Sequence, residues 1–154
     1  MVIRRLAAIA VLAIAAFAGY RYYDGTYAPE KKYKDFAEEI LKRHYDAAAA
    51  MTDGLSSQDL AKQGTQEKVG GGPSMFQTLF PSRFDIESRT ATSLGVTLHA
   101  VQTVLFNPPG VESATRPAMY AKMNQVVMLH KTDGGWKVTS FENKFEKMDS
   151  LTSR

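Results

Sequence analysis

The chain opens with a run of apolar residues that no polar residue interrupts. Residues 6–17 read LAAIAVLAIAAF, and a short lead containing Arg4 and Arg5 precedes them. A positively charged lead followed by an apolar run is typical of membrane-targeting segments. Because the arginines precede the run, the positive-inside rule places the N-terminus on the cytoplasmic side of a membrane and the rest of the chain outside.

Two interpretations of this segment differ in where it ends. The tripeptide Ala16-Phe17-Ala18 fits the small-x-small motif of signal peptidase sites, so cleavage after Ala18 would release a secreted or periplasmic domain. Alternatively, a helix over residues 2–23 would be about 33 Å long and would remain as a single-pass anchor in the cytoplasmic (inner) membrane. We favour an anchor over residues 1–23, because tyrosines cluster just after that motif and tyrosine prefers the membrane interface.

The body follows a predicted linker over residues 24–29, and its first element has helical periodicity. Pro29 and Glu30 are typical of a first helical turn. Apolar residues then recur at helical spacing as far as Ala48. This pattern predicts one long helix that ends near residues 51–54.

A second, short helix is predicted after the long one. Ser56 and Asp59 form a capping-box pattern for a helix over residues 57–63, and Gly64 is its stop signal. The composition then shifts to glycine and proline. We expect one further turn or short helix over residues 74–80.

From residue 82 onward the pattern changes to alternation. Four segments fit strands: RFDIESRTAT, LGVTLHAVQTVLF, MYAKMNQVVMLH and WKVTSFENKF. Gly95 marks a turn between the first two, and the sequence DGG at 133–135 is a tight-hairpin signal between the last two. Helices first and antiparallel strands afterwards define an α+β domain over residues 30–148, with the helices packed on one sheet face and a tail over residues 149–154.

Charge and cysteine content restrict the functions open to this body. Three of the 19 basic residues, Arg4, Arg5 and Arg21, lie in the N-terminal segment, and the remaining 16 balance the 16 acidic residues. A body without a basic excess is poorly suited to nucleic acid. The absence of cysteine excludes disulfides and thiolate chemistry. No phosphate-binding loop or serine-nucleophile motif occurs, so the sequence implies no catalytic residue and no cofactor.

The order of elements, together with the closing hairpin DGGWKV at residues 133–138, resembles the nuclear transport factor 2-like superfamily, also described as cystatin-like cone folds. The resemblance covers residues 30–148. It implies a curved sheet wrapped around the first helix, whose cone-shaped interior is an empty core, a ligand pocket or a catalytic chamber. The superfamily includes isomerases, dehydratases, binding domains and membrane-anchored assembly factors, among them an anchored component of type IV secretion systems. The aspartate and tyrosine pattern of its steroid isomerases has no match here, so no catalytic residue carries over.

Three polar residues are candidates for lining such an interior: His44, Gln102 and Gln125. His44 lies at the apolar margin of the long helix, and both glutamines alternate in register with apolar residues, so inward amides would line a cavity. If the second and third strands pair symmetrically around their loop, Gln102 lies opposite Ala121 and the glutamines are about 13 Å apart, in separate sites. The three histidines lie on different predicted elements without metal-ligand spacing, so no metal site is predicted.

These observations favour a membrane-tethered extracytoplasmic domain without catalysis. Its expected partners are the membrane, through the N-terminal helix, and a protein of the envelope or a second copy of the chain. The alternative is a small-ligand-binding protein or enzyme that uses the cone interior. A polar cavity of about 300 Å³ or more would favour that alternative, whereas solid packing of Phe36, Ile40, Val104 and Phe106 across the interior would exclude it.

Overall fold

The computed structural model describes residues 2–64, 78–110 and 115–151, with side chains of the first helix described from Ile9 onward. The helical elements are α1 (Val2–Tyr22), the π-helical turn η1 (Tyr23–Tyr27), α2 (Ala28–Leu41), α3 (Tyr45–Ala50) and α4 (Ser57–Gly64). The strands are β1 (Thr78–Ala91), β2 (Val96–Asn107), β3 (Met119–Thr132) and β4 (Gly135–Ser150). They form one antiparallel sheet in the order β1-β2-β3-β4. The predicted α+β class is confirmed, with a long N-terminal helix and a four-stranded antiparallel sheet.

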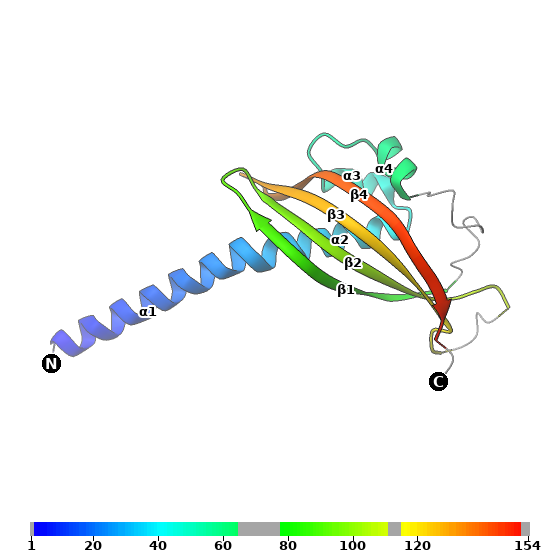
Figure 1. Cartoon of the computed structure of the whole chain (residues 1–154). Coiled ribbons are helices and arrows are strands. Elements are labelled where there is room, and N and C mark those ends of the chain that lie inside the picture. The colour runs from blue at the N-terminus through cyan, green and yellow to red at the C-terminus, as the bar shows by residue number, and fades with distance from the viewer. Residues whose placement is uncertain (1, 65–77, 111–114, 152–154) are drawn as a thin grey trace.

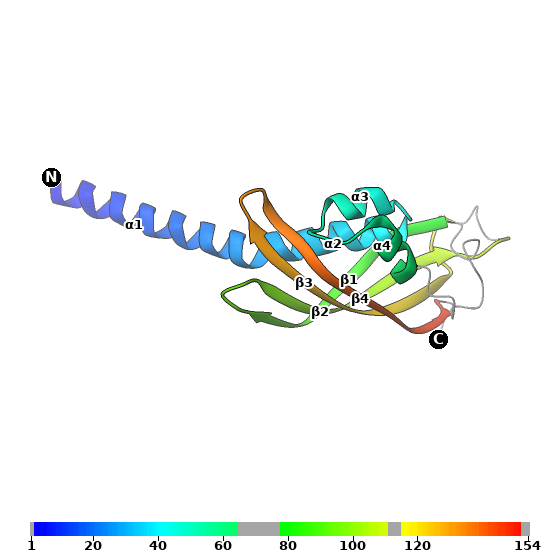
Figure 2. The same ribbon diagram turned by 90° about the horizontal axis from the view of Figure 1, so that it is seen from above.

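The helices α2, α3 and α4 cover one face of the sheet, and α1 projects away from the body (Figure 1). Seen from above, α2 crosses the hollow side of the curved strands (Figure 2). The core forms where they meet. Phe36 of α2 is fully buried and packs edge to face on Phe141 of β4, with ring centroids 5.0 Å apart. Burying one such ring contributes roughly 1.5–3 kcal/mol.

The strands bend at four irregularities in their pairing: two between β1 and β2 and two between β3 and β4. Such bulges add twist and curvature to a sheet. The turn from β1 to β2 requires glycine at Gly95, because a Cβ atom there would lie 2.1 Å from the carbonyl oxygen of Leu129. This close approach brings the β1–β2 turn against β3.

The single long helix expected from Pro29 to residues 51–54 is wrong, since α2 ends at Leu41 and α3 begins at Tyr45. Arg43 adopts a left-handed conformation with φ 63°. The amide of Arg43 donates to the carbonyl of Ile40, and the amide of His44 donates to that of Glu39. These two bonds form a Schellman motif, which ends a helix and usually places glycine where this chain has arginine.

Other boundaries also differ from expectation. The expected linker over residues 24–29 is helical, because η1 joins α1 to α2 without an extended segment. The first strand begins at Thr78, so 78–80 are not helical, and residues 74–77 lie outside the described part of the chain. β4 continues to Ser150, which shortens the expected tail over 149–154. The short helix capped by Ser56 is confirmed, with Ser56 Oγ 3.2 Å from the amide of Asp59.

Among the described residues, no helix is both long enough and apolar enough to cross a membrane.

Candidate functional site

A cavity of about 230 Å³ lies between the C-terminal end of α2 and the sheet. Its lining combines apolar side chains, three amides and two cations: Ala37, Ile40, Leu41, Lys42, Arg43, Leu79, Gln102, Met123, Gln125 and Asn143. Gln102, Gln125 and Asn143 are at most 8% exposed, so the polar groups lie deep in the cavity. The cations belong to the exposed end of α2 and lie at its mouth.

The three amides are joined by hydrogen bonds to one another and to Tyr33 and Ser82. We name these five residues the amide network. The hydroxyl of Tyr33 donates to Gln125 Oε1 at 2.6 Å. Gln125 Nε2 donates to Gln102 Oε1 at 2.8 Å and to Asn143 Oδ1 at 3.1 Å. Gln102 Nε2 in turn donates to Ser82 Oγ at 3.1 Å. Neutral amides tolerate this burial because each oxygen that leaves water accepts a hydrogen bond.

The predicted separation of the two glutamines is wrong. In the sheet Gln102 pairs with Met123, and Gln125 pairs with Ala100, so the two glutamines lie two positions apart on adjacent strands. The symmetric pairing with Ala121 misplaced the register by two residues. Their side chains therefore meet in one site.

His44 does not line this cavity. It follows the helix-ending motif at Arg43, its side chain is 61% exposed, and its Nδ1 lies 2.9 Å from Glu39 Oε2. The break between α2 and α3 removes His44 from the continuous helical face on which the expectation depended. The glutamines line the interior, and the histidine lies outside it.

Tyr33 connects the amide network to the core of α2. It is fully buried, and burial raises the pKa of its phenol because the charged form would lose hydration. The hydroxyl therefore stays protonated and donates to Gln125 throughout the physiological range. A fixed donor at this point orients the Gln125 amide, and Gln125 then orients its two neighbours.

The residue types around the cavity define the chemistry that it offers. None of the described lining residues is Asp, Glu, His or Cys, the side chains that serve most often as general base or zinc ligand. Elsewhere in the described ranges, no group of three such residues lies close enough to hold a metal ion. What the cavity does offer is hydrogen-bond donors, cations and a short apolar wall.

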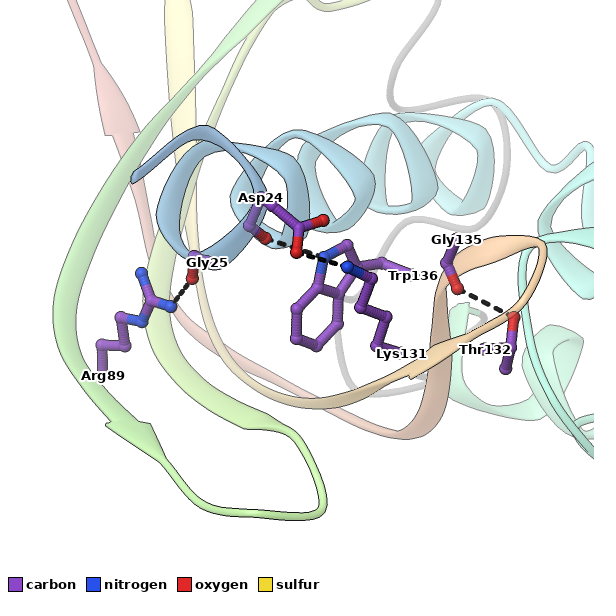
Figure 3. A network of polar contacts seen from close by, with 7 residues as sticks. All are labelled: Asp24, Gly25, Arg89, Lys131, Thr132, Gly135 and Trp136. Atoms are coloured by element: carbon purple, nitrogen blue, oxygen red, sulfur yellow. Dashed lines mark hydrogen bonds and ion pairs between the residues drawn. The ribbon is translucent and has the colours of Figure 1, made fainter. Parts of the chain in front are cut away.

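A second polar cluster lies where α1 meets the body, and we name it the junction (Figure 3). The side chain of Lys131 forms an ion pair with the Asp24 carboxylate, and Trp136 Nε1 donates to the Asp24 carbonyl at 2.9 Å. On the other side, the Arg89 guanidinium donates to the carbonyl of Gly25. Three side chains from β1, β3 and β4 thus hold the π-helical turn η1.

Sequence reasoning missed the residues that complete both clusters. Asn143 lies between Phe141 and Phe145 in the alternation of β4, a polar residue on an apolar face, which is the same signal that identified the glutamines. Tyr33 lies on the apolar face of the predicted long helix, and helical spacing does not reveal a polar role for its hydroxyl. The junction gave no local signal, because its donors are more than 60 residues from η1 in the chain.

Comparisons of the chain with protein-family models, with curated proteins and with solved structures found no match of any of the three kinds.

Proposed function

We propose that the chain is a membrane-tethered extracytoplasmic domain of the nuclear transport factor 2-like type, which binds a protein partner in the cell envelope and has no catalytic activity. α1 is its anchor, and the body is held beside the membrane surface. The observation that carries the proposal is the uncovered apolar surface of α1.

That surface surrounds the helix. The side chains of Ile9, Val11, Leu12, Ile14 and Phe17 are each between 62% and 69% exposed. Successive residues of a helix turn by about 100°, so these five positions point in all directions around the axis. A helix that buries one face in protein would show a single apolar stripe instead. An all-round apolar surface is suited to lipid.

The length of the whole helix is consistent with a single pass. α1 contains 21 residues, which corresponds to about 32 Å at 1.5 Å per residue, against about 30 Å of hydrocarbon. The proposed span requires all of α1, including the apolar positions before Ile9. Arg21 and the exposed rings of Tyr20, Tyr22 and Tyr23 then fall at headgroup depth.

The junction supports a role in assembly. Because η1 is helical and bonded to three strands, the body cannot swing on an extended tether. A body fixed to its anchor presents the same face at the same height above the bilayer, which suits a partner that is also membrane-proximal. The cavity, at about 230 Å³, is smaller than the roughly 300–1,000 Å³ typical of pockets that enclose a drug-sized ligand, and Phe36, Val104 and Phe106 are fully buried.

Membrane attachment is tested by paired leucine substitutions in the full-length protein. Leu12→Arg puts a charge on the middle of α1, which costs roughly 2.5–3.5 kcal/mol of insertion free energy, so the protein should shift from the carbonate-resistant membrane fraction to the soluble one. Leu94→Arg is the matched control, because Leu94 is also exposed, at 85% against 69% for Leu12, but lies in the β1–β2 turn. Equal behaviour of both variants would contradict the anchor.

Intact mass and partner recovery complete the test. We expect the uncut mass in the membrane fraction, whereas a soluble species beginning at Gly19 would show that the segment is cleaved. Affinity purification from detergent extracts should recover a stoichiometric partner or a homo-oligomer. A clean monomer under all growth conditions would oppose the assembly role.

A further inference from the structure

We infer that the cavity under α2 binds a small aliphatic carboxylate, held by the amide network and Arg43. This inference is independent of membrane attachment, since it concerns only the interior of the body. It rests on three features of the cavity: which hydrogen-bonding groups remain free, which charges lie at the mouth, and how large the space is.

The amide network has hydrogen-bond donors that no described residue uses. Each of the amide oxygens already accepts a hydrogen bond, from Tyr33 or from Gln125. By contrast, the side-chain NH₂ of Asn143 makes no hydrogen bond with any described residue, and Gln102 uses one of its two N–H groups, toward Ser82. Three N–H hydrogens therefore remain to meet an acceptor in the cavity.

The mouth carries positive charge that the body leaves uncommitted. Lys42 has only a long ion pair with Glu39, at 3.9 Å, and the Arg43 guanidinium has no hydrogen-bond or ion-pair partner among the described residues. Donor groups inside and cations outside select an anion over a cation or a neutral molecule. A guanidinium is also the side chain best suited to a carboxylate, because it can donate two parallel hydrogen bonds.

The backbone at Arg43 gives a second, independent indication. Its left-handed conformation is the one that glycine adopts without strain at helix ends, and arginine there is unfavourable by comparison. Strained positions of this kind cluster at functional sites. Here the strained residue also lines the cavity. A role of its side chain in binding accounts for arginine at a position where glycine would be unstrained.

The space fixes the size and polarity of the rest of the ligand. About 230 Å³ corresponds to roughly seven or eight water molecules at about 30 Å³ each, which admits a carboxylate with a few carbons. Ile40, Leu41, Leu79 and Met123 provide an apolar wall for those carbons. An anion without an apolar part, such as phosphate, would leave that wall unused.

Titration calorimetry on the full-length protein in detergent micelles tests the inference, with straight-chain carboxylates from formate to butanoate as probes. We expect millimolar affinity that improves from formate to propanoate, with propanamide and phosphate binding at least about tenfold more weakly. Side-chain amide signals of Asn143 and Gln102 should shift on titration. Equal affinity for propanoate and propanamide, or no binding of any carboxylate, would overturn the inference.

Two variants separate binding from folding. Arg43→Gly removes the guanidinium and relieves the left-handed strain, so the melting temperature should rise while propanoate affinity falls by about tenfold. Asn143→Asp keeps the oxygen that accepts from Gln125 but replaces the free donors with a carboxylate, and should abolish binding. Lys62→Ala, an exposed cation on α4, is the control that leaves affinity unchanged. Unchanged affinity in Arg43→Gly would refute the assigned role of Arg43.

Discussion

The amide network and the junction are both polar clusters, but they are built from different groups because they lie in different surroundings. The network is neutral throughout, and its glutamines are at most 3% exposed. The junction uses two cations, one carboxylate and two backbone carbonyls, at positions that water partly reaches. Burying a charge costs far more than burying an amide. Of the two clusters, therefore, only the junction, at the edge of the fold, contains charged groups.

The two clusters also differ in what they leave free. At the junction, Arg89, Lys131 and Trp136 all direct donors at η1, two of them at backbone carbonyls. Bonds to the backbone fix the path of the chain, so the junction determines the direction of α1. The network instead bonds side chain to side chain and keeps three N–H hydrogens for the cavity. The junction thus orients α1, whereas the amide network leaves N–H groups facing the cavity.

The largest expected effect comes from removing the buried donor of the network. Tyr33→Phe leaves Gln125 Oε1 without its 2.6 Å donor in the core, which should lower the free energy of unfolding by roughly 1–3 kcal/mol. Denaturant titration in micelles measures this.

The chain contains a matched control for that substitution. The hydroxyl of Tyr45 is buried and has no partner among the described residues. Tyr45→Phe removes a polar atom that makes no bond, so stability should stay level or rise. If both substitutions cost the same, the loss would reflect the ring environment rather than the hydrogen bond, and the network would not stabilise the fold.

The sequence predicted the architecture well where the signal was local. Alternation identified all four strands, and the residues DGG at 133–135 identified the last hairpin, because period and turn chemistry act over a few residues. The capping pair Ser56 and Asp59 gave the short helix for the same reason. The break at Arg43 escaped, since glycine is the usual residue for that conformation and its absence favours a continuous helix.

The site was only partly predictable, because it depends on register. Gln102 and Gln125 were recognised as inward-facing, but a two-residue difference in pairing decided whether their side chains met. The loop between β2 and β3 sets that pairing, and its composition does not determine where the strands begin. The junction depends on contacts between η1 and strands far along the chain, which no local pattern reveals.

Substitution at the junction is expected to have a smaller effect on stability but a clear effect on the orientation of α1. Trp136→Phe keeps an aromatic ring and removes the donor to the Asp24 carbonyl, at a cost of about 1 kcal/mol. α1 should then sample a wider range of directions. The chain has no cysteine, so spin labels can be attached at two introduced cysteines, Ala15→Cys in α1 and Glu142→Cys in β4. Double electron–electron resonance then measures the distribution of distances between the two labels.

The control for this experiment lies within η1 itself. Tyr27 is exposed, and its ring contacts Tyr23 at a centroid distance of 5.3 Å. Tyr27→Phe removes a hydroxyl from the same turn without touching a bond to the sheet. Its distance distribution should match that of the unaltered chain. A distribution as narrow in Trp136→Phe as in the control would mean that the indole bond does not hold α1.

The smallest effects on stability are expected at alkaline pH. Each cluster contains one group whose pKa the fold raises. Burial raises the pKa of Tyr33, and the bond to the Asp24 carboxylate raises that of Lys131. Both groups keep their protons longer in the folded state than in the unfolded one. Their contributions are therefore intact at neutral pH and decline as pH passes the ordinary values of about 10 for tyrosine and about 10.4 for lysine.

The two contributions can be separated by variant and by readout. Tyr33→Phe should flatten the fall in unfolding free energy above about pH 10, because the buried phenol no longer resists ionisation. Lys131→Met should leave that fall nearly unchanged, because its ion pair is exposed and contributes little, but it should remove the widening of the α1 distance distribution that alkali causes in the unaltered chain. Lys62→Met, which deletes an exposed ion pair to Asp59 on α4, is the matched control and should retain that widening. If the distribution stays narrow at high pH in the unaltered chain, Lys131 does not contribute to orientation, and the carbonyl bonds from Arg89 and Trp136 alone define the junction.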